Sequence, residues 1–258
     1  MNDLLPKFPA FLLIFVRITS FFLMMPLFSY RTIPTVFKIG FGLFLSWLIF
    51  YSIHPPTFEI NGPYILLVIK EAMVGLLIGF CAYLIMSAIQ TAGAFIDFQM
   101  GFSMANVIDP QTGAQSPLMG QYFHIFGLFL LLAMNGHYLL IDGIYNSYHF
   151  IPIDKAWLPF GSSKVIEFIL KSFGSMFIIA FQMALPVVGS LFLVDVALGI
   201  VARTVPQLNI FVVGMPVKIA VGFIVIITVM GSILAVVSNL FETTLQTMRG
   251  LLELLGGS

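Results

Sequence analysis

AMVGLLIGFCAYLIMSAIQTAGAFI, residues 72–96, contains no Asp, Glu, Lys or Arg. A helix needs about 20 consecutive apolar residues to cross the hydrocarbon core of a bilayer, so this run is long enough for one crossing. Three other stretches also lack these four charged residues: 110–141, 172–194 and 219–241. The sequence therefore predicts a protein with several membrane-spanning helices.

The composition of the whole chain supports this prediction. Of its 258 residues, 60% are hydrophobic and 9% are charged, and the mean hydropathy is +1.07. Soluble domains carry about 25% charged residues, so 11 basic and 11 acidic side chains cannot cover a soluble surface of this size. The net charge of zero gives nucleic acid no general attraction. We expect an integral membrane protein that contacts lipid and does not bind nucleic acid.

Apolar segments and polar connections alternate along the chain. We expect six helical segments, at 8–28, 35–53, 64–96, 122–148, 165–194 and 219–241. Most of the polar content lies between them, in connections at 29–38, 97–121, 149–164 and 195–218. No segment sustains the strand alternation over about ten residues that a membrane barrel needs. The predicted fold class is therefore all-α.

Sequence signatures of common enzymes do not occur. The chain has no G-x-S-x-G, H-E-x-x-H or G-x-x-x-x-G-K-[ST] motif. Its histidines, His54, His124, His137 and His149, are too dispersed to predict a metal site from their spacing. Cys81 is the only cysteine, which leaves no disulfide within the chain and no cysteine-based metal site. We expect a protein that is not an enzyme and has no catalytic residue, metal ligand or cofactor.

The segment 97–121 combines turn-forming, polar and apolar residues between two charge-free helices. Its glycines and prolines predict irregular backbone, which cannot face hydrocarbon because unpaired peptide groups are costly there. Either a water-filled cavity or an ordinary external loop would suit such a segment. Three flexible methionines, Met100, Met104 and Met119, favour a plug or gasket that closes around differing contours. Filling of an ordinary core remains the simpler reading of these methionines.

Two aspartates stand in similar contexts, FIDFQMG (95–101) and LVDVALG (193–199). An aspartate near membrane depth is costly, so Asp97 and Asp195 should have partners such as Arg203 or face water. Internal duplication would explain the likeness, but two helix ends with the same capping requirement explain it more simply. Gln90, Ala94 and Asp97 share one helix face, which predicts a wet path or a subunit contact.

Two helix faces look suited to packing. Gly75 and Gly79 form a G-x-x-x-G pattern, which allows the backbones of two helices to approach closely. Near the C-terminus, a 4-3-4-3 spacing of apolar residues predicts an amphipathic interface helix, with Phe241, Leu245, Met248, Leu252 and Leu255 on its apolar side.

The chain resembles the flagellar biosynthetic protein FliR family, whose injectisome counterparts serve type III secretion. The resemblance covers nearly the whole length. Its most specific parts are FIDFQMGFSMANVIDPQTGAQSPLMGQ (95–121), MNGHY (134–138) and VDVALGIVARTVPQLNIFVVGMPVKI (194–219). MNGHY departs slightly, because members often have a second histidine where Tyr138 stands.

This resemblance implies an export-gate subunit in the bacterial inner membrane, within the export apparatus of the flagellar basal body. Residues 1–165 would form a FliP-like part and residues 166–258 a FliQ-like hairpin with an amphipathic tail. The implied partners are FliP-like and FliQ-like subunits, an FlhB-like switch protein and the exported unfolded flagellar proteins. In that family much of the assembly stands above the membrane plane, although its subunits look transmembrane by hydropathy.

The resemblance also implies roles for particular residues. The plug inside the export channel would contain Met100, Gly101, Phe102, Met104, Val107, Ile108, Asp109, Pro110, Leu118 and Met119. The turn with Arg203, Pro206, Gln207 and Asn209 would pack against neighbouring subunits and the switch protein. From spacing and charge, and not from the resemblance, we also expect Gly75, Gly79, Asp97 and Asp195 at contacts between subunits.

The leading hypothesis is therefore a channel subunit that helps to form and seal the conduit for unfolded flagellar proteins. An alternative is a small-molecule or ion transporter with a midplane site around Asp97 and Gln90. A structural scaffold whose 97–121 segment has no gating role is a third possibility.

Overall fold

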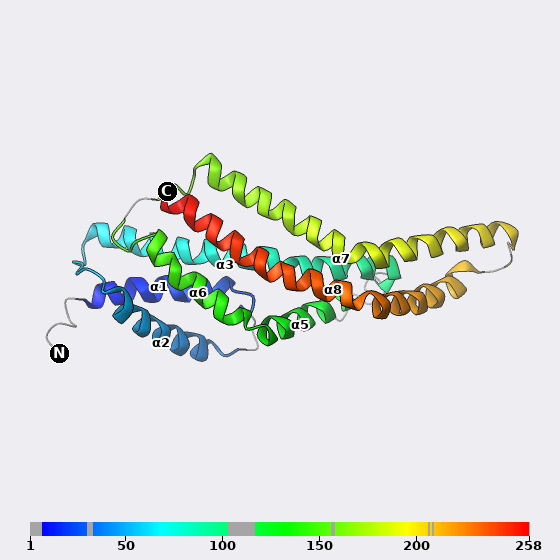
Figure 1. Ribbon diagram of the computed structural model, residues 1–258, viewed down its shortest axis with the longest axis horizontal. Helices are drawn as coiled ribbons and strands as arrows, with labels where there is room; N and C mark the ends of the chain where they lie inside the picture. Colours follow the sequence, from blue (N-terminus) through cyan, green and yellow to red (C-terminus); the bar gives the residue numbers. More distant parts are fainter. Residues whose placement is uncertain are drawn as a thin grey trace. The chain divides into compact units, whose positions relative to one another are not determined.

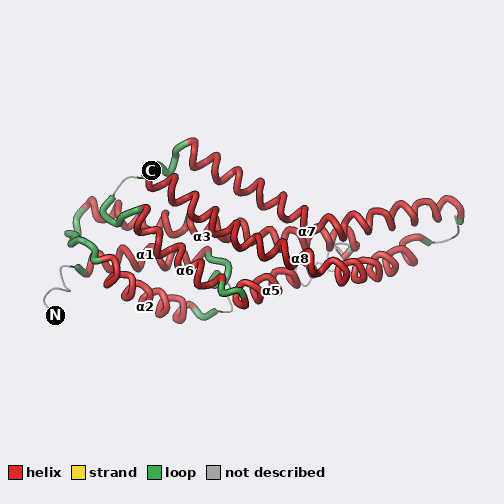
Figure 2. The backbone as a smooth tube through the Cα atoms, in the orientation of Figure 1, coloured by secondary structure: helices red, strands yellow, loops and turns green. Residues whose placement is uncertain are grey.

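The computed structural model describes residues 7–29, 33–102, 117–155, 158–205, 207 and 209–257. Every regular element within these ranges is a helix (Figures 1 and 2). The helices are α1 (Phe8–Met24), α2 (Thr35–Ile53), α3 (Gly62–Met100), α5 (Leu118–Ala133), α6 (Gly136–Phe150), α7 (Ser163–Thr204) and α8 (Ile210–Gly256). The prediction of an all-α protein is confirmed.

The chain forms two compact units, each assembled from segments that are distant in sequence. The first unit comprises residues 1–85, 132–173 and 242–258, and the second comprises 86–131 and 174–241. Helices α3, α7 and α8 each contribute one part to each unit. The boundaries of these units differ from the division into residues 1–165 and 166–258 that the family resemblance implies. That division into a FliP-like and a FliQ-like part stays a prediction.

Local sequence explains where the first helices end. Met25 precedes Pro26, and a residue before proline is disfavoured in the helical conformation, so α1 stops at Met24. Helix α2 stops at Ile53 because His54, with φ of 50° in the left-handed region, is followed by Pro55. Both ends thus depend on prolines in the following connection.

The predicted segment 122–148 is not one straight helix. Helices α5 and α6 are bent by 74° at a short break. At this break Asn135 adopts the left-handed conformation with φ of 58°, which asparagine tolerates better than most residues. The MNGHY string therefore marks a corner between two helices.

The predicted connection 195–218 is wrong in its extent. Helix α7 continues to Thr204 and α8 begins at Ile210, so most of that range is helical. Consequently Asp195 lies inside α7, and it does not share with Asp97 the task of capping a helix end. The charges of Asp195 and Lys218 misled the prediction, because each side chain is paired with the other across the two helices.

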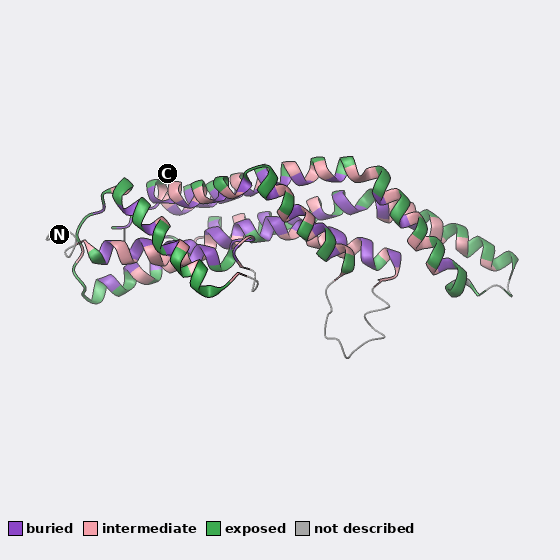
Figure 3. Cartoon of the chain, turned by 90° about the horizontal axis from the view of Figure 1, so that it is seen from below, coloured by how far each residue is buried: buried purple, intermediate pink, exposed green. Residues whose placement is uncertain are grey.

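Each of the six predicted segments forms helix, although they are not all long enough to cross a membrane. Within the described ranges, four helices are long and apolar enough to cross a membrane, or five if α5 and α6 count as one bent span. Helix α1, with 17 residues, is shorter than these. Of the residues in an apolar 18-residue stretch of each helix, 61% are buried in α3 and 17% in α8. Figure 3 colours the described residues of the chain by how far each is buried. Helix α3 is thus a core element, and α8 has a largely uncovered apolar surface.

The core of the first unit contains a close contact between α1 and α3. A Cβ atom added at Gly79 would lie 2.8 Å from both the carbonyl oxygen of Phe21 and the Cβ of Met24. One added at Gly75 would overlap the carbonyl oxygen of Arg17. The close approach predicted from the G-x-x-x-G pattern is present, and α1 of the same chain is the helix that uses it.

Candidate functional site

The side chain of Asp97 joins α3 to α5, the two helices at either end of the 101–121 segment, through the backbone of Met119 and Gly120. Its carboxylate oxygens accept hydrogen bonds from the backbone N–H of Met119 at 2.9 and 3.1 Å and from that of Gly120 at 3.4 Å. Both donors lie in the first turn of α5, where backbone N–H groups lack helical partners and the helix dipole favours a negative charge. Asp97 therefore fixes the start of α5 to the last turn of α3.

Small residues allow this contact between α3 and α5. A Cβ atom at Gly93 would overlap the backbone of Gly120 and lie 2.7 Å from the carbonyl carbon of Met119. One at Gly120 would lie 3.0 Å from the carbonyl oxygen of Gln90. The predicted polar face of α3 thus packs against α5 within the second unit.

The end of α3 is also seated on α8. Met100 is fully buried, and its side chain fills the space beside Gly222, where an added Cβ would lie 2.9 Å from the methyl carbon of Met100. Gly101 then leaves the helix with φ of +86°, a conformation in which other residues are strained. The 101–121 segment therefore begins next to a residue that is packed against α8, because the Met100 side chain fills the space beside Gly222.

A hydrogen bond joins the same end of α3 to α7, and an ion pair joins α7 to α8. Asp195 on α7 pairs with Lys218 on α8 at 2.9 Å and accepts a hydrogen bond from the Gln99 side chain at 2.8 Å. The partner of Asp195 is thus Lys218 instead of the predicted Arg203. We call Asp97, Gln99, Met100, Asp195 and Lys218 the anchor cluster. It contains no reactive arrangement, and its geometry suits holding a segment in place.

Five of the predicted plug residues lie within the described ranges. Besides the buried Met100 and the left-handed Gly101, Phe102 and Met119 are partly exposed and Leu118 is 55% exposed. The other five predicted plug residues lie outside the described ranges: Met104, Val107, Ile108, Asp109 and Pro110.

Of the predicted contact residues after Asp195, Arg203, Gln207 and Asn209 lie within the described ranges, between the last turn of α7 and the start of α8. Arg203 is exposed in the last turn of α7, where a cation is favourable to the helix dipole. Gln207 is exposed, and Pro206 lies outside the described residues. The side-chain oxygen of Asn209 accepts hydrogen bonds from the N–H of Phe211 at 3.1 Å and of Val212 at 3.4 Å, so Asn209 caps α8.

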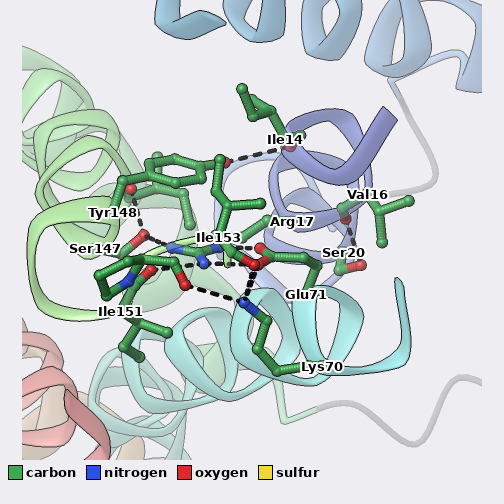
Figure 4. A network of polar contacts seen from close by, with 12 residues as sticks. Ile14, Val16, Arg17, Ser20, Lys70, Glu71, Ser147, Tyr148, Ile151 and Ile153 are labelled. Carbon is green, nitrogen blue, oxygen red and sulfur yellow. Dashed lines mark hydrogen bonds and ion pairs between the residues drawn. The ribbon is translucent and has the colours of Figure 1, made fainter. Parts of the chain in front are cut away.

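A second polar network, in the first unit, was not predicted from the sequence (Figure 4). Arg17 on α1 donates two hydrogen bonds to the Glu71 carboxylate on α3, one of them at 2.9 Å. It also donates to the Ser147 hydroxyl at 3.0 Å and to the Ile151 carbonyl at 2.9 Å. The guanidinium carbon lies 4.1 Å from the centre of the Tyr148 ring. Arg17 thus joins α1, α3 and the end of α6.

Lys70 completes this network. Its ammonium pairs with Glu71 and donates to the carbonyls of Pro152 at 3.2 Å and Ile153 at 3.0 Å. Arg17 and Glu71 are fully buried, and the Lys70 side chain is 2% exposed. Burying a charged side chain costs free energy unless the charge is paired. Arg17, Lys70 and Glu71, which lie within or next to apolar segments, are therefore the sequence signal from which this network could have been predicted.

Comparison with known proteins identifies the family. Residues 8–244 match the family described as bacterial export proteins, family 1. The chain is 58% identical to "Flagellar biosynthetic protein FliR" of Bacillus subtilis (strain 168), with 100% of both chains covered. It is 28% identical to the protein of that name from Escherichia coli (strain K12), over 88% of this chain and 86% of the relative.

A relative with a different name is similar at lower identity. "Yop proteins translocation protein T" of Yersinia pestis is 26% identical, and the match covers 84% of each chain. Since the family match extends over most of the residues and includes both ends of the anchored segment, the chain belongs to the bacterial export proteins, family 1.

Proposed function

We propose that this chain is a subunit of the flagellar type III protein export apparatus in the bacterial inner membrane. The observation that carries the proposal is the 58% identity to a flagellar biosynthetic protein along the entire chain. Long apolar helices with uncovered surfaces support membrane insertion and contact with neighbouring subunits. FliP-like and FliQ-like subunits and an FlhB-like protein are the proposed neighbours.

Within this role, the 101–121 segment acts as the plug of the export channel. The anchor cluster supports this assignment, because Asp97 holds α5 to α3 while Met100 seats the start of the segment on α8. A segment fixed at its two ends can change the conformation between them without releasing the helices. The roles of Met104, Val107 and Ile108 as sealing residues belong to this proposal.

The proposed mechanism is gating without catalysis by this chain. At rest, the apolar side chains of the plug exclude water and ions from the conduit. Displacement of the segment opens a path for an extended polypeptide, and the energy comes from other parts of the apparatus. Dewetting of an apolar constriction is an established way to close a pore.

The transporter alternative has less support. A midplane binding site needs a carboxylate available to solute, but both oxygens of Asp97 accept backbone hydrogen bonds from α5. Asp97 is also 3% exposed. These contacts favour an anchoring role for Asp97 within the export subunit.

The plug proposal is tested by replacing Met100, Met104 and Met119 together with glycine. The triple variant should make cells permeable to ions, because the seal loses the deformable side chains of Met104 and Met119 and the start of the segment loses Met100, which seats it on α8. The matched control replaces Met24, Met73 and Met134, which are exposed and lie elsewhere, with glycine. Ion permeability at background in the plug variant, with normal amounts of the protein in the membrane, would show that these methionines do not seal a channel.

The wider proposal is tested by mild detergent extraction of the tagged chain from its own host, native sizing and mass spectrometry of associated proteins. We expect a large complex containing FliP-like and FliQ-like subunits. Recovery as a monomer or homodimer, together with intact flagellar secretion in a deletion strain, would refute the export role. The two experiments are independent, since a chain within the complex could still lack a sealing plug.

A further inference from the structure

A groove in the first unit lies between α6 and the C-terminal part of α8. It has a volume of about 730 Å³ and is lined by twelve residues. The two helices meet closely beside it, since a Cβ atom at Gly143 would lie 2.6 Å from the methyl carbon of Met248. The groove does not include any residue of the anchor cluster.

The groove concentrates charge in a chain that has little of it. Asp142, Glu242, Arg249 and Glu253 are four of its twelve lining residues, whereas 9% of all residues are charged. All four side chains are exposed. Three carboxylates and one guanidinium give the groove a negative balance.

The negative charge of the groove limits the kinds of molecule that can bind in it. Exposed carboxylates are costly against lipid tails, and the negative balance repels the phosphates of lipid headgroups and nucleic acids. Leu139 is 44% exposed and Leu245 is partly exposed on the same lining, so an occupant can also bury apolar surface here. A protein segment with basic and apolar residues meets both conditions.

We propose that this groove binds an amphipathic helix of a different protein, with Lys or Arg residues placed toward Asp142, Glu242 and Glu253. A furrow between two packed helices accepts the side-chain ridge of a third. Basic residues at helical spacing would pair with the carboxylates, while apolar residues between them cover Leu139 and Leu245. The inference concerns a surface of the first unit and does not rest on the plug proposal.

The test uses a photo-reactive benzoylphenylalanine in place of Leu139 or Gln246 in the full chain in cells. Both positions line the groove. Mass spectrometry of the cross-linked peptide should identify a segment of another protein with at least two Lys or Arg residues spaced three, four or seven apart. The same probe at Ile166, an exposed position of the same unit outside the groove, should not capture this peptide.

Charge reversal tests the chemistry of binding separately from secretion. The double change Glu242→Lys and Glu253→Lys should reduce the yield of this cross-link at least tenfold, and reversing the captured basic residues to Glu should restore it. Glu167→Lys is the matched control, because Glu167 is an exposed carboxylate of the same unit on α7. The control should leave the yield unchanged.

Several results would overturn the proposal. Capture of lipid, of another copy of this chain or of a peptide without basic residues would each exclude a basic partner helix. So would equal cross-link yields in the charge-reversed and unchanged proteins, or no cross-link at all in cells that still secrete flagellar proteins.

Discussion

The guanidinium of Arg17 and the ammonium of Lys70 share a single buried carboxylate, that of Glu71. Replacing Glu71 with Gln would remove the carboxylate with which both buried cations pair, whereas Arg17→Met would leave the Lys70–Glu71 pair in place. Breaking a buried pair by removing one partner costs about 3–5 kcal/mol. We therefore expect Glu71→Gln to lower the thermal unfolding temperature in detergent more than Arg17→Met does.

The control for this prediction is Glu167→Gln. Glu167 pairs with Lys171 on the same helix, but their side chains are 64% and 74% exposed. Water screens such a pair, so its loss should leave the unfolding temperature unchanged. Equal unfolding temperatures for Glu71→Gln and Glu167→Gln would contradict the inferred importance of the buried network.

Asp97 allows a second prediction for a single residue. Asp97→Asn removes the charge and keeps one accepting oxygen, so the amides of Met119 and Gly120 lose part of their capping. Removing a helix cap costs roughly 0.5–2 kcal/mol. Hydrogen exchange at these two amides should become up to about tenfold faster, since 1.4 kcal/mol corresponds to a factor of ten.

Asp142→Asn provides the comparison for Asp97→Asn. Asp142 is exposed and accepts a hydrogen bond from the Asn146 side chain within α6. Its replacement should not change exchange at the start of α5. Unchanged exchange in Asp97→Asn as well would mean that the start of α5 is held by its packing alone.

At the scale of helices, three glycines with different surroundings make a graded test. Ala at Gly93 would press against the backbone of Gly120, which cannot move aside without separating α3 from α5. Such overpacking costs typically about 1–3 kcal/mol. Ala at Gly222 meets the flexible end of Met100, and Ala at Gly189 meets nothing within 4 Å.

Thermal unfolding should therefore rank the variants. Gly93→Ala should be the least stable, Gly222→Ala intermediate, and Gly189→Ala at least as stable as the unchanged protein because alanine favours helix by about 1 kcal/mol over glycine. If Gly93→Ala were as stable as Gly189→Ala, the close contact between α3 and α5 would not contribute to the fold.

The helices also show what sequence can and cannot predict. Long charge-free runs predicted α3, α7 and α8 because a continuous apolar pattern reports burial or membrane directly. The extension of α7 past Asp195 was missed because its charge is satisfied by Lys218, which is 23 residues away in sequence. Likewise, spacing predicted a close contact at Gly75 but could not identify α1 as the partner. Pairings between helices depend on tertiary structure, which a local pattern does not contain.

At the scale of the whole molecule, the apolar surface is larger than a soluble monomer normally exposes. In an apolar 18-residue stretch of each helix, only 28% of the residues are buried in α7 and 17% in α8. Lipid and neighbouring subunits are the two surroundings that could cover these faces. Membership in a bacterial export family supports neighbouring subunits for part of this surface.

Cysteine labelling distinguishes these two surroundings. Cys81 is the only cysteine and is 1% exposed, so the unchanged chain gives little background. We expect Ile227→Cys, at a position on α8 that is 73% exposed, to react with N-ethylmaleimide in the detergent-solubilised chain alone. In the co-purified complex its reaction should be at least tenfold slower because a neighbouring subunit covers α8. Equal rates in both preparations would mean that lipid, and not protein, covers this face in the membrane.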